Sequence, residues 1–239
     1  MLIELIPSID STNSELMRRA AQGDYSTVCL VTHEQTAGRG RLGRAWLSDQ
    51  DSLTFSMGIP LKPYDWSGLS LAVGVSIAQS LHPNIQIKWP NDLWVGGKKL
   101  AGILIETIAI KDTRRDDQSD SRYAVIGVGI NLKAPSVSAI QELRTPPTGL
   151  RFLLPHITRE ETLKRIQGPL MDAIKGFEAE GYASFAVQFA KRDALVGKSI
   201  NLSNGLSGQY LGINGSGALM LQTENGVQTI VSQEVSECL

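Results

Sequence analysis

The chain has little cysteine, almost no net charge and no long hydrophobic run. Its 239 residues include two cysteines, Cys29 in an apolar stretch and Cys238 near the end, too few for a disulfide framework. A formal net charge of −1 argues against a general nucleic-acid binder. There is no apolar run of about 18 residues and no charged-then-apolar leader. We therefore expect a cytoplasmic protein with reduced thiols and no membrane segment.

Several catalytic signatures are missing as well. The three histidines, His33, His82 and His156, accompany no G-x-S-x-G nucleophile motif. There is also no Walker loop and no His/Cys cluster with metal-ligand spacing, so we expect no metal held by the protein alone. The chemistry still open to such a chain is one that stabilises negative charge on phosphate oxygens with little covalent help from side chains.

The most informative segment present is a loop that combines glycine with arginine. Glycines allow a backbone to approach a ligand closely, and arginines donate forked hydrogen bonds to phosphate or carboxylate oxygens. A tryptophan at the end of the loop adds a flat apolar face. The segment predicts a loop that encloses an anionic, ring-bearing small molecule, and it reads Gly38-Arg39-Gly40-Arg41-Leu42-Gly43-Arg44-Ala45-Trp46.

The same glycines spell G-x-G-x-x-G, the pattern of dinucleotide-binding folds. That interpretation requires a strand before the loop and a helix directly after it. Residues 27–32 are typical of a buried strand, but the residues after Gly43 show no helical period and contain several turn formers. We therefore reject a nicotinamide or flavin site.

Hydrophobic patterning predicts an α+β chain. We expect helices at 14–22, 67–81, 158–180 and 182–191, with Thr12 and Glu15, and again Thr158 and Glu161, at capping-box spacing. Residues 111–122 and 135–155 are irregular. We expect strands at 27–32, 52–59, 85–89, 93–95, 99–106 and 123–132.

From Leu195 the pattern changes to short strands. Residues 199–202, 209–213, 218–222 and 227–231 alternate with three Asn-Gly pairs, which favour tight hairpin turns. We expect two domains: 1–192, which carries the site, and a small β-barrel at 195–239.

A second candidate segment, 88–102, begins K-W-P-N-D and continues through Gly96-Gly97 to Lys98 and Lys99. The proline places Asn91 and Asp92 on a bend, and strand alternation sends the two lysines to opposite faces. One lysine can then enter a pocket, where Gly102 leaves room beside it. Surface charges on an edge hairpin are the alternative, but the nearby arginine–glycine loop favours a site.

Four segments in this order resemble the biotin protein ligases (biotin–[acetyl-CoA-carboxylase] ligases): 11–13 (S-T-N), 35–46, 88–92 with 99–102, and 127–131 (G-V-G-I-N). The resemblance implies a mixed β-sheet domain with flanking helices, as in class II synthetases and biotin ligases, followed by a small SH3-like β-barrel. It also implies that ATP activates biotin to biotinyl-5′-AMP, and that biotin then passes to a lysine of a biotin carboxyl carrier protein.

The resemblance further implies a set of site residues, with Lys99 between the biotin carboxylate and the α-phosphate. Mg²⁺ would bridge phosphates and water. Lys99, Arg41 and Asp92 are the implied catalytic residues. The implied biotin-binding residues are Ser11, Thr12, Asn13, Gln35, Gly38, Arg39, Gly40, Arg41, Lys99 and Gly102. The implied nucleotide-binding residues are Arg41, Arg44, Trp46, Asn91, Lys99 and Asn131.

The chain departs from the family pattern at both ends. Members that act as repressors carry a helix-turn-helix domain before the first motif, whereas here Ser11 lies close to the first residue, so we expect no DNA binding. The last segment, 232–239, lacks the basic residue that some members place near ATP. The sequence leaves open a homodimer, a lipoyl or octanoyl transferase of the same fold, and a non-catalytic biotin-binding module.

Overall fold

The computed structural model describes residues 1–48, 51–110, 121–135 and 145–237. The chain divides into two compact units. The first comprises Met1–Lys62 and Lys98–Leu163, and the second comprises Pro63–Gly97 and Lys164–Leu239. Each unit therefore takes its residues from two separate stretches of sequence. The boundary at 192–195 expected from the sequence stays a prediction.

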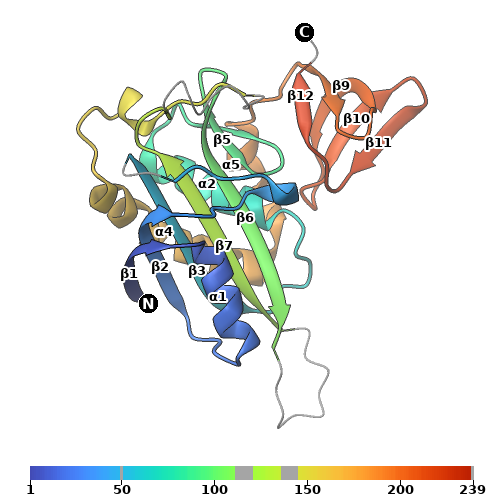
Figure 1. The fold of residues 1–239 in the computed structure, drawn as a ribbon. Helices are drawn as coiled ribbons and strands as arrows, with labels where there is room; N and C mark the ends of the chain where they lie inside the picture. The colour runs from blue at the N-terminus through green and yellow to red at the C-terminus, as the bar shows by residue number, and fades with distance from the viewer. Residues whose placement is uncertain (49–50, 111–120, 136–144, 238–239) are drawn as a thin grey trace, which may run out of the picture. The chain divides into compact units, whose positions relative to one another are not determined.

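The first unit is built on a mixed sheet. Strand β1 is parallel to β2, and α1 (Thr12–Ala21) connects the two, whereas the other neighbouring strands are antiparallel (Figure 1). Helix α1 packs against one face of this sheet. The strands lie side by side in the order β1 (Leu2–Ile9), β2 (Val28–Gln35), β3 (Ser52–Leu61), β7 (Arg122–Asn131) and β6 (Lys98–Ala109).

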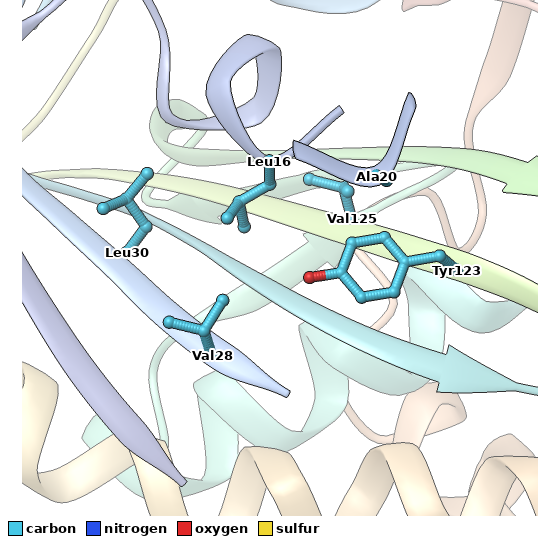
Figure 2. Packing of buried hydrophobic residues seen from close by; sticks show 6 residues of the cluster. All are labelled: Leu16, Ala20, Val28, Leu30, Tyr123 and Val125. Carbon is cyan, nitrogen blue, oxygen red and sulfur yellow. The ribbon is translucent and has the colours of Figure 1, made fainter. Parts of the chain in front are cut away.

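Helix α1 covers an apolar part of the sheet. Leu16 and Ala20 are one turn apart, so both point from the helix to the sheet, where they meet Val125 of β7 (Figure 2). Burying a side chain such as Leu16 stabilises the fold by about 1.5–3 kcal/mol. Tyr123 completes this core, and burial raises the pKa of its hydroxyl to about 12. That hydroxyl donates to the carbonyl of Ser26 at 2.9 Å.

The second unit contains helices and a separate β-sheet. Its five-stranded sheet is antiparallel throughout, in the order β11-β10-β9-β8-β12. Helix α4 (Arg159–Glu180) runs from the first unit into the second. The remaining elements are α2 (Leu69–Leu81), β4 (Gln86–Lys88), β5 (Asp92–Val95), a 3-10 turn (Tyr182–Phe185), α5 (Ala186–Ala190), β8 (Ser199–Leu202), β9 (Ser207–Ile213), β10 (Leu219–Thr223), β11 (Gly226–Ile230) and β12 (Val235–Glu237).

Close packing joins the C-terminal sheet to the helical part of the second unit. The indole of Trp89 donates to the carbonyl of Gly217 at 3.0 Å. A Cβ on Gly217 would lie 2.8 Å from the Cα of Gly68, just before α2. Tyr210 of β9 donates to the Asp193 carboxylate at 2.6 Å, and burial raises the pKa of Asp193. The C-terminal sheet therefore does not stand apart from its neighbours.

The structure confirms a mixed α+β fold with a C-terminal antiparallel sheet, and corrects several details. Strand β1 and strand β12 were not predicted. Residues 182–191 form a 3-10 turn followed by a five-residue helix, not one helix. The N-cap of α1 is Ser11, not Thr12, because the Thr12 hydroxyl is engaged in the interior. Thr158 does cap α4, accepting from the Glu161 amide at 3.1 Å.

Three predictions fall wholly or partly outside the described residues. Cys238 lies there, as do residues 111–120 and 136–144 of the two segments predicted to be irregular. Within the described part of the chain, no helix is both long enough and apolar enough to cross a membrane.

Candidate functional site

On the sheet face that α1 covers, the side chains change along the strands from large and apolar to small and polar. Beyond the apolar core, the register places Ser56 opposite Gly127, and Thr54 opposite Gly129. Residues paired across strands point to the same side of a sheet. The sheet face thus becomes a floor of small and polar residues, called here the glycine–serine floor: Ser52, Thr54, Ser56, Gly102, Gly127, Gly129 and Asn131.

Asn13, in the first turn of α1, lies directly on this floor. A Cβ on Gly127 would overlap the Asn13 side chain, with its Cγ only 2.9 Å away. The Asn13 amide donates to Glu106 Oε2 at 2.9 Å and to the Leu104 carbonyl at 3.3 Å, and its Oδ1 accepts from Ser56. Both amide protons of Asn13 are therefore used within the protein, and only Oδ1 keeps capacity to accept from a ligand.

Thr12 extends the same hydrogen-bonded network to β2. Its backbone N–H donates to Gln35 Oε1 at 2.8 Å, and its hydroxyl lies 2.6 Å from the Ser56 hydroxyl. Because Ser56 gives its proton to Asn13, the Thr12 hydroxyl shares its single proton between Ser56 and Gln35 Oε1, which lies 3.2 Å away. Thr12 and Asn13 are at least 96 % buried, so this network is an interior one. Ser11 accepts from the Ser14 amide at 3.3 Å, and within the described part of the chain its own proton has no acceptor.

Residues 38–46, called here the arginine loop, fold back on themselves. The Gly40 amide donates to the Arg44 carbonyl at 2.7 Å, and the Trp46 amide donates to the Gly38 carbonyl at 2.9 Å. Gly38 has no room for a side chain, because a Cβ there would overlap the Trp46 carbonyl. Gly43 has φ +74°, a left-handed conformation that favours glycine. Among the described residues 44–48 no helix follows Gly43, which agrees with the rejection of a dinucleotide fold.

The indole of Trp46 covers part of the glycine–serine floor. A Cβ on Gly129 would come within 2.6 Å of the Trp46 Nε1, and one on Gly102 would lie 3.5 Å from its Cζ3. The two glycines are cross-strand partners, so together they leave a recess in the floor that the Trp46 ring fills. The Trp46 Nε1 is buried with no hydrogen-bond partner among the described residues, and it remains available to an acceptor.

Lys99 lies at the edge of this recess. Its Nζ is 3.6 Å from the position that a Cβ on Gly102 would occupy, whereas the neighbouring Lys98 is exposed. Two backbone hydrogen bonds hold Lys99: its amide donates to the Pro146 carbonyl at 2.9 Å, and its carbonyl accepts from the Thr148 amide at 2.8 Å. Asn131 donates to the Thr148 carbonyl at 3.2 Å. The segment 146–148 therefore positions both predicted residues.

An ion pair fixes the turn before α1. Arg18 donates to both carboxylate oxygens of Asp10, at 2.7 and 2.9 Å, and the Ser11 amide donates to Asp10 Oδ1. The hydrogen bonds from Arg18 lower the pKa of Asp10 to about 2. Asp10 therefore stays ionised across the physiological range and holds the turn from which Thr12 and Asn13 reach the floor.

The predicted residues fall into two groups by unit. Asn91 and Asp92 belong to the second unit, where Asn91 lies in the turn after Pro90 and Asp92 opens β5 opposite Lys88. The Lys88 ammonium lies 4.3 Å from the Trp94 ring centroid, a cation–π contact. The other predicted residues all lie in the first unit: Ser11, Thr12, Asn13, Gln35, Gly38, Arg39, Gly40, Arg41, Arg44, Trp46, Lys99, Gly102 and Asn131.

Two residues of this site were missed from the sequence. Ser56 joins Thr12 to Asn13, and its signal was present, because residues 52–57 alternate polar and apolar as a floor strand should. Glu106 accepts from both Asn13 and Arg39, at 2.9 and 2.7 Å. No local pattern marks Glu106, since Arg39 is 67 positions away in the chain.

Comparisons with known proteins agree on one family. Residues 5–131 match the model of the biotin/lipoate A/B protein ligase family. The chain is 30% identical to the bifunctional ligase/repressor BirA of Escherichia coli, covering 98% of this chain and 73% of that protein. It is 28% identical to a biotin–[acetyl-CoA-carboxylase] ligase of Paracoccus denitrificans, covering 97% and 98%. A solved biotin protein ligase from Aquifex aeolicus, in complex with biotin and ATP, superposes with a TM-score of 0.79 at 25% identity, covering 99% and 98%.

Proposed function

The chain belongs to the biotin/lipoate A/B protein ligase family, and we propose that the glycine–serine floor and the arginine loop form its site for biotin activation. It is an ATP-dependent biotin protein ligase, like the relatives and solved structures that it matches. The observation that carries the assignment of the site is the family match over residues 5–131, which contains the arginine loop and the whole floor.

Two reactions in sequence make up this activity. A carboxylate oxygen of biotin attacks the α-phosphorus of ATP. The bond between the α-phosphorus and the oxygen that bridges it to the β-phosphorus breaks, and pyrophosphate leaves with that oxygen. The product is biotinyl-5′-AMP, a mixed anhydride. An acceptor lysine amine then attacks its carbonyl carbon, AMP leaves with the bonding pair, and the amine loses a proton.

The first reaction must bring two anions together, and nearby cationic side chains would offset the electrostatic repulsion between them. At about 4 Å, two unit charges repel by about 4 kcal/mol at an effective dielectric constant of about 20. Lys99 lies at the floor beside Gly102, and Arg39 and Arg41 lie in the arginine loop. We assign Lys99 to the space between the biotin carboxylate and the α-phosphate, and Arg41 to the loop that closes over the adenylate.

The polar groups of biotin fit the α1 side of the floor. The Ser11 hydroxyl has a proton to donate, and Asn13 Oδ1 can still accept. Gln35 is oriented by its Oε1, which accepts from the Thr12 amide. Gly38 lies beside the Gln35 amide, and Gly102 lies beside Lys99. With Gly40, they stay predicted contacts of biotin. We assign biotin to this region.

The nucleotide fits the opposite side, where Trp46 and Asn131 lie. We assign Trp46 to the adenine ring, Asn131 and Asn91 to polar groups of the nucleotide, and Arg44 to triphosphate oxygens. These side chains supply amides and positive charge and contain no carboxylate. Mg²⁺ would therefore be held by phosphate oxygens and water, and would neutralise charge on the leaving pyrophosphate.

The second reaction needs a base or orienting group for the acceptor amine. Asp92 is the carboxylate that we assign to this role, in the turn-to-strand segment that follows Pro90. The acceptor that we propose is the lysine of a biotin carboxyl carrier protein. The absence of DNA binding, a cytoplasmic location and the oligomeric state stay predictions.

Biotin-dependent exchange of labelled pyrophosphate into ATP tests this function. Labelled pyrophosphate enters ATP only by reversal of adenylate formation, so exchange requires a carboxylate that the enzyme can activate. The purified chain should therefore catalyse exchange with biotin and not with lipoate. Exchange with lipoate alone would indicate a lipoyl-type enzyme. Binding of biotin with no exchange at all would indicate a non-catalytic module.

The arginine loop should exchange its amide hydrogens more slowly when biotinyl-5′-AMP is bound. Gly38, Gly40 and Gly43 give its backbone freedom, and the phosphate of a bound adenylate would add an anionic partner for its arginines. Ordering of the loop would also protect the anhydride from water. Hydrogen–deuterium exchange over residues 38–46 measures this, with α2 as the internal reference. Equal exchange rates in the free and bound protein would contradict the prediction.

A further inference from the structure

We propose that Glu106 is a positioning residue of this site, which ties the arginine loop to the glycine–serine floor through one carboxylate oxygen. The proposal rests on the assignment of that site to biotin activation. Glu106 lies on β6 opposite Val125, so its side chain points to the same sheet face as the floor. Asn13 Nδ2 donates to its Oε2 at 2.9 Å, and Arg39 Nη2 donates to the same oxygen at 2.7 Å.

The bond to Asn13 makes Glu106 the end of an interior network. Asn13 uses both amide protons on Glu106 and the Leu104 carbonyl, and its Oδ1 accepts from Ser56. Ser56 is in turn bonded to Thr12, and Thr12 to Gln35. Without the Glu106 carboxylate, one amide proton of a 96 % buried asparagine loses its nearest acceptor, and the amide keeps only the longer bond to the Leu104 carbonyl and the bond from Ser56.

The bond to Arg39 gives the same carboxylate a hold on the arginine loop. An ion pair between partly exposed side chains contributes little to stability by itself. Its effect here is on the loop conformation, because Arg39 is the second residue of a glycine-rich segment. A loop that is already ordered has less conformational freedom to lose when a ligand binds, so affinity rises. Glu106 therefore acts through Asn13 and Arg39, on biotin affinity more than on the chemical step.

Steady-state kinetics of the purified chain test this with Glu106→Ala and Glu106→Gln. We expect Glu106→Ala to raise the KM for biotin by about tenfold to a hundredfold, the range for losing hydrogen bonds to a charged group. The kcat at saturating biotin should change by less than about threefold. Glu106→Gln keeps a neutral acceptor of the same shape and should give an intermediate KM. A fall in kcat with unchanged KM would overturn the positioning role.

Glu4→Ala is the matched control. Glu4 is also a partly exposed carboxylate of this sheet paired with an arginine at 2.8 Å, but its partner, Arg19, is on α1 and not on the loop. Glu4→Ala should lower the melting temperature about as much as Glu106→Ala and leave the KM for biotin unchanged. Equal KM values for the two variants would overturn the proposal.

Amide exchange of the ligand-free protein separates this proposal from the function itself. Glu106→Ala and Glu106→Gln should both speed exchange across residues 38–46, and Glu4→Ala should not. This measurement needs neither biotin nor ATP. If the wild-type chain shows no biotin-dependent exchange, the function fails while the tie between loop and floor can still hold. If loop exchange is the same in all four proteins, the tie fails whatever the activity.

Discussion

Replacing Lys99 with methionine should lower the rate of adenylate formation by about 10²–10³, the usual effect of removing one donor from a preorganised anionic site. Methionine keeps the length and apolar stem of the side chain but removes its charge. The Lys99 ammonium lies beside Gly102 at the edge of the floor, where the two reacting anions are expected to meet. Biotin-dependent pyrophosphate exchange measures the rate.

The control for this variant is Lys98→Met. Lys98 is the neighbouring residue of the same strand, carries the same charge, and is exposed. It should retain wild-type exchange activity. A Lys99→Met protein with more than half of the wild-type rate would exclude the proposed role of Lys99.

Replacing Gly127 with alanine should weaken biotin binding and destabilise the fold. The added Cβ would overlap the Asn13 side chain, and backbone on both sides of Gly127 is paired to β3 and β6, so the strand cannot shift. Overpacking of this kind costs about 1–3 kcal/mol of unfolding free energy. The displaced Asn13 would release Ser56 and Glu106, so we expect the KM for biotin to rise by about tenfold or more.

Gly176→Ala is the matched control for Gly127→Ala. A Cβ on Gly176 meets only Phe185 Cζ at 3.9 Å, an ordinary contact, and the residue lies inside α4, so alanine there should stabilise the helix by up to about 1 kcal/mol. Denaturant unfolding and the KM for biotin measure both variants. A Gly127→Ala protein with wild-type stability and KM would show that Asn13 does not need its place on the floor.

The glycines of 127–131 show which structural features this sequence motif predicts and which it does not. The sequence predicted a strand at 123–132 and, by resemblance, a site residue at Asn131. The reason for the glycines appears only in the fold, where Gly127 makes room for Asn13 and Gly129 for Trp46. These partners come from α1 and from the arginine loop, so neither contact is visible in the local pattern.

Strand β1 was missed for a related reason. Its segment, LIELIPSI, contains a proline, and most of its side chains are exposed because it pairs on only one side, with β2. An edge strand of this kind lacks the alternation of a half-buried strand.

The N-cap of α1 was displaced by one residue because buried hydrogen bonds to Ser56 and Gln35, distant in sequence, take the Thr12 hydroxyl.

The sequence by itself determined the elements whose signals are local: the helix at α2, the central strands, the Asn-Gly hairpins of the C-terminal sheet, and an arginine–glycine loop suited to an anion. Periodicity and turn chemistry act over a few residues and can be read directly. Only the tertiary structure decided which of these residues meet. Glu106 is joined to Asn13 and Arg39 because β6 lies beside β7 and α1 crosses both, and hydrogen bonds between residues 67 and 93 positions apart leave no trace in any short window of sequence.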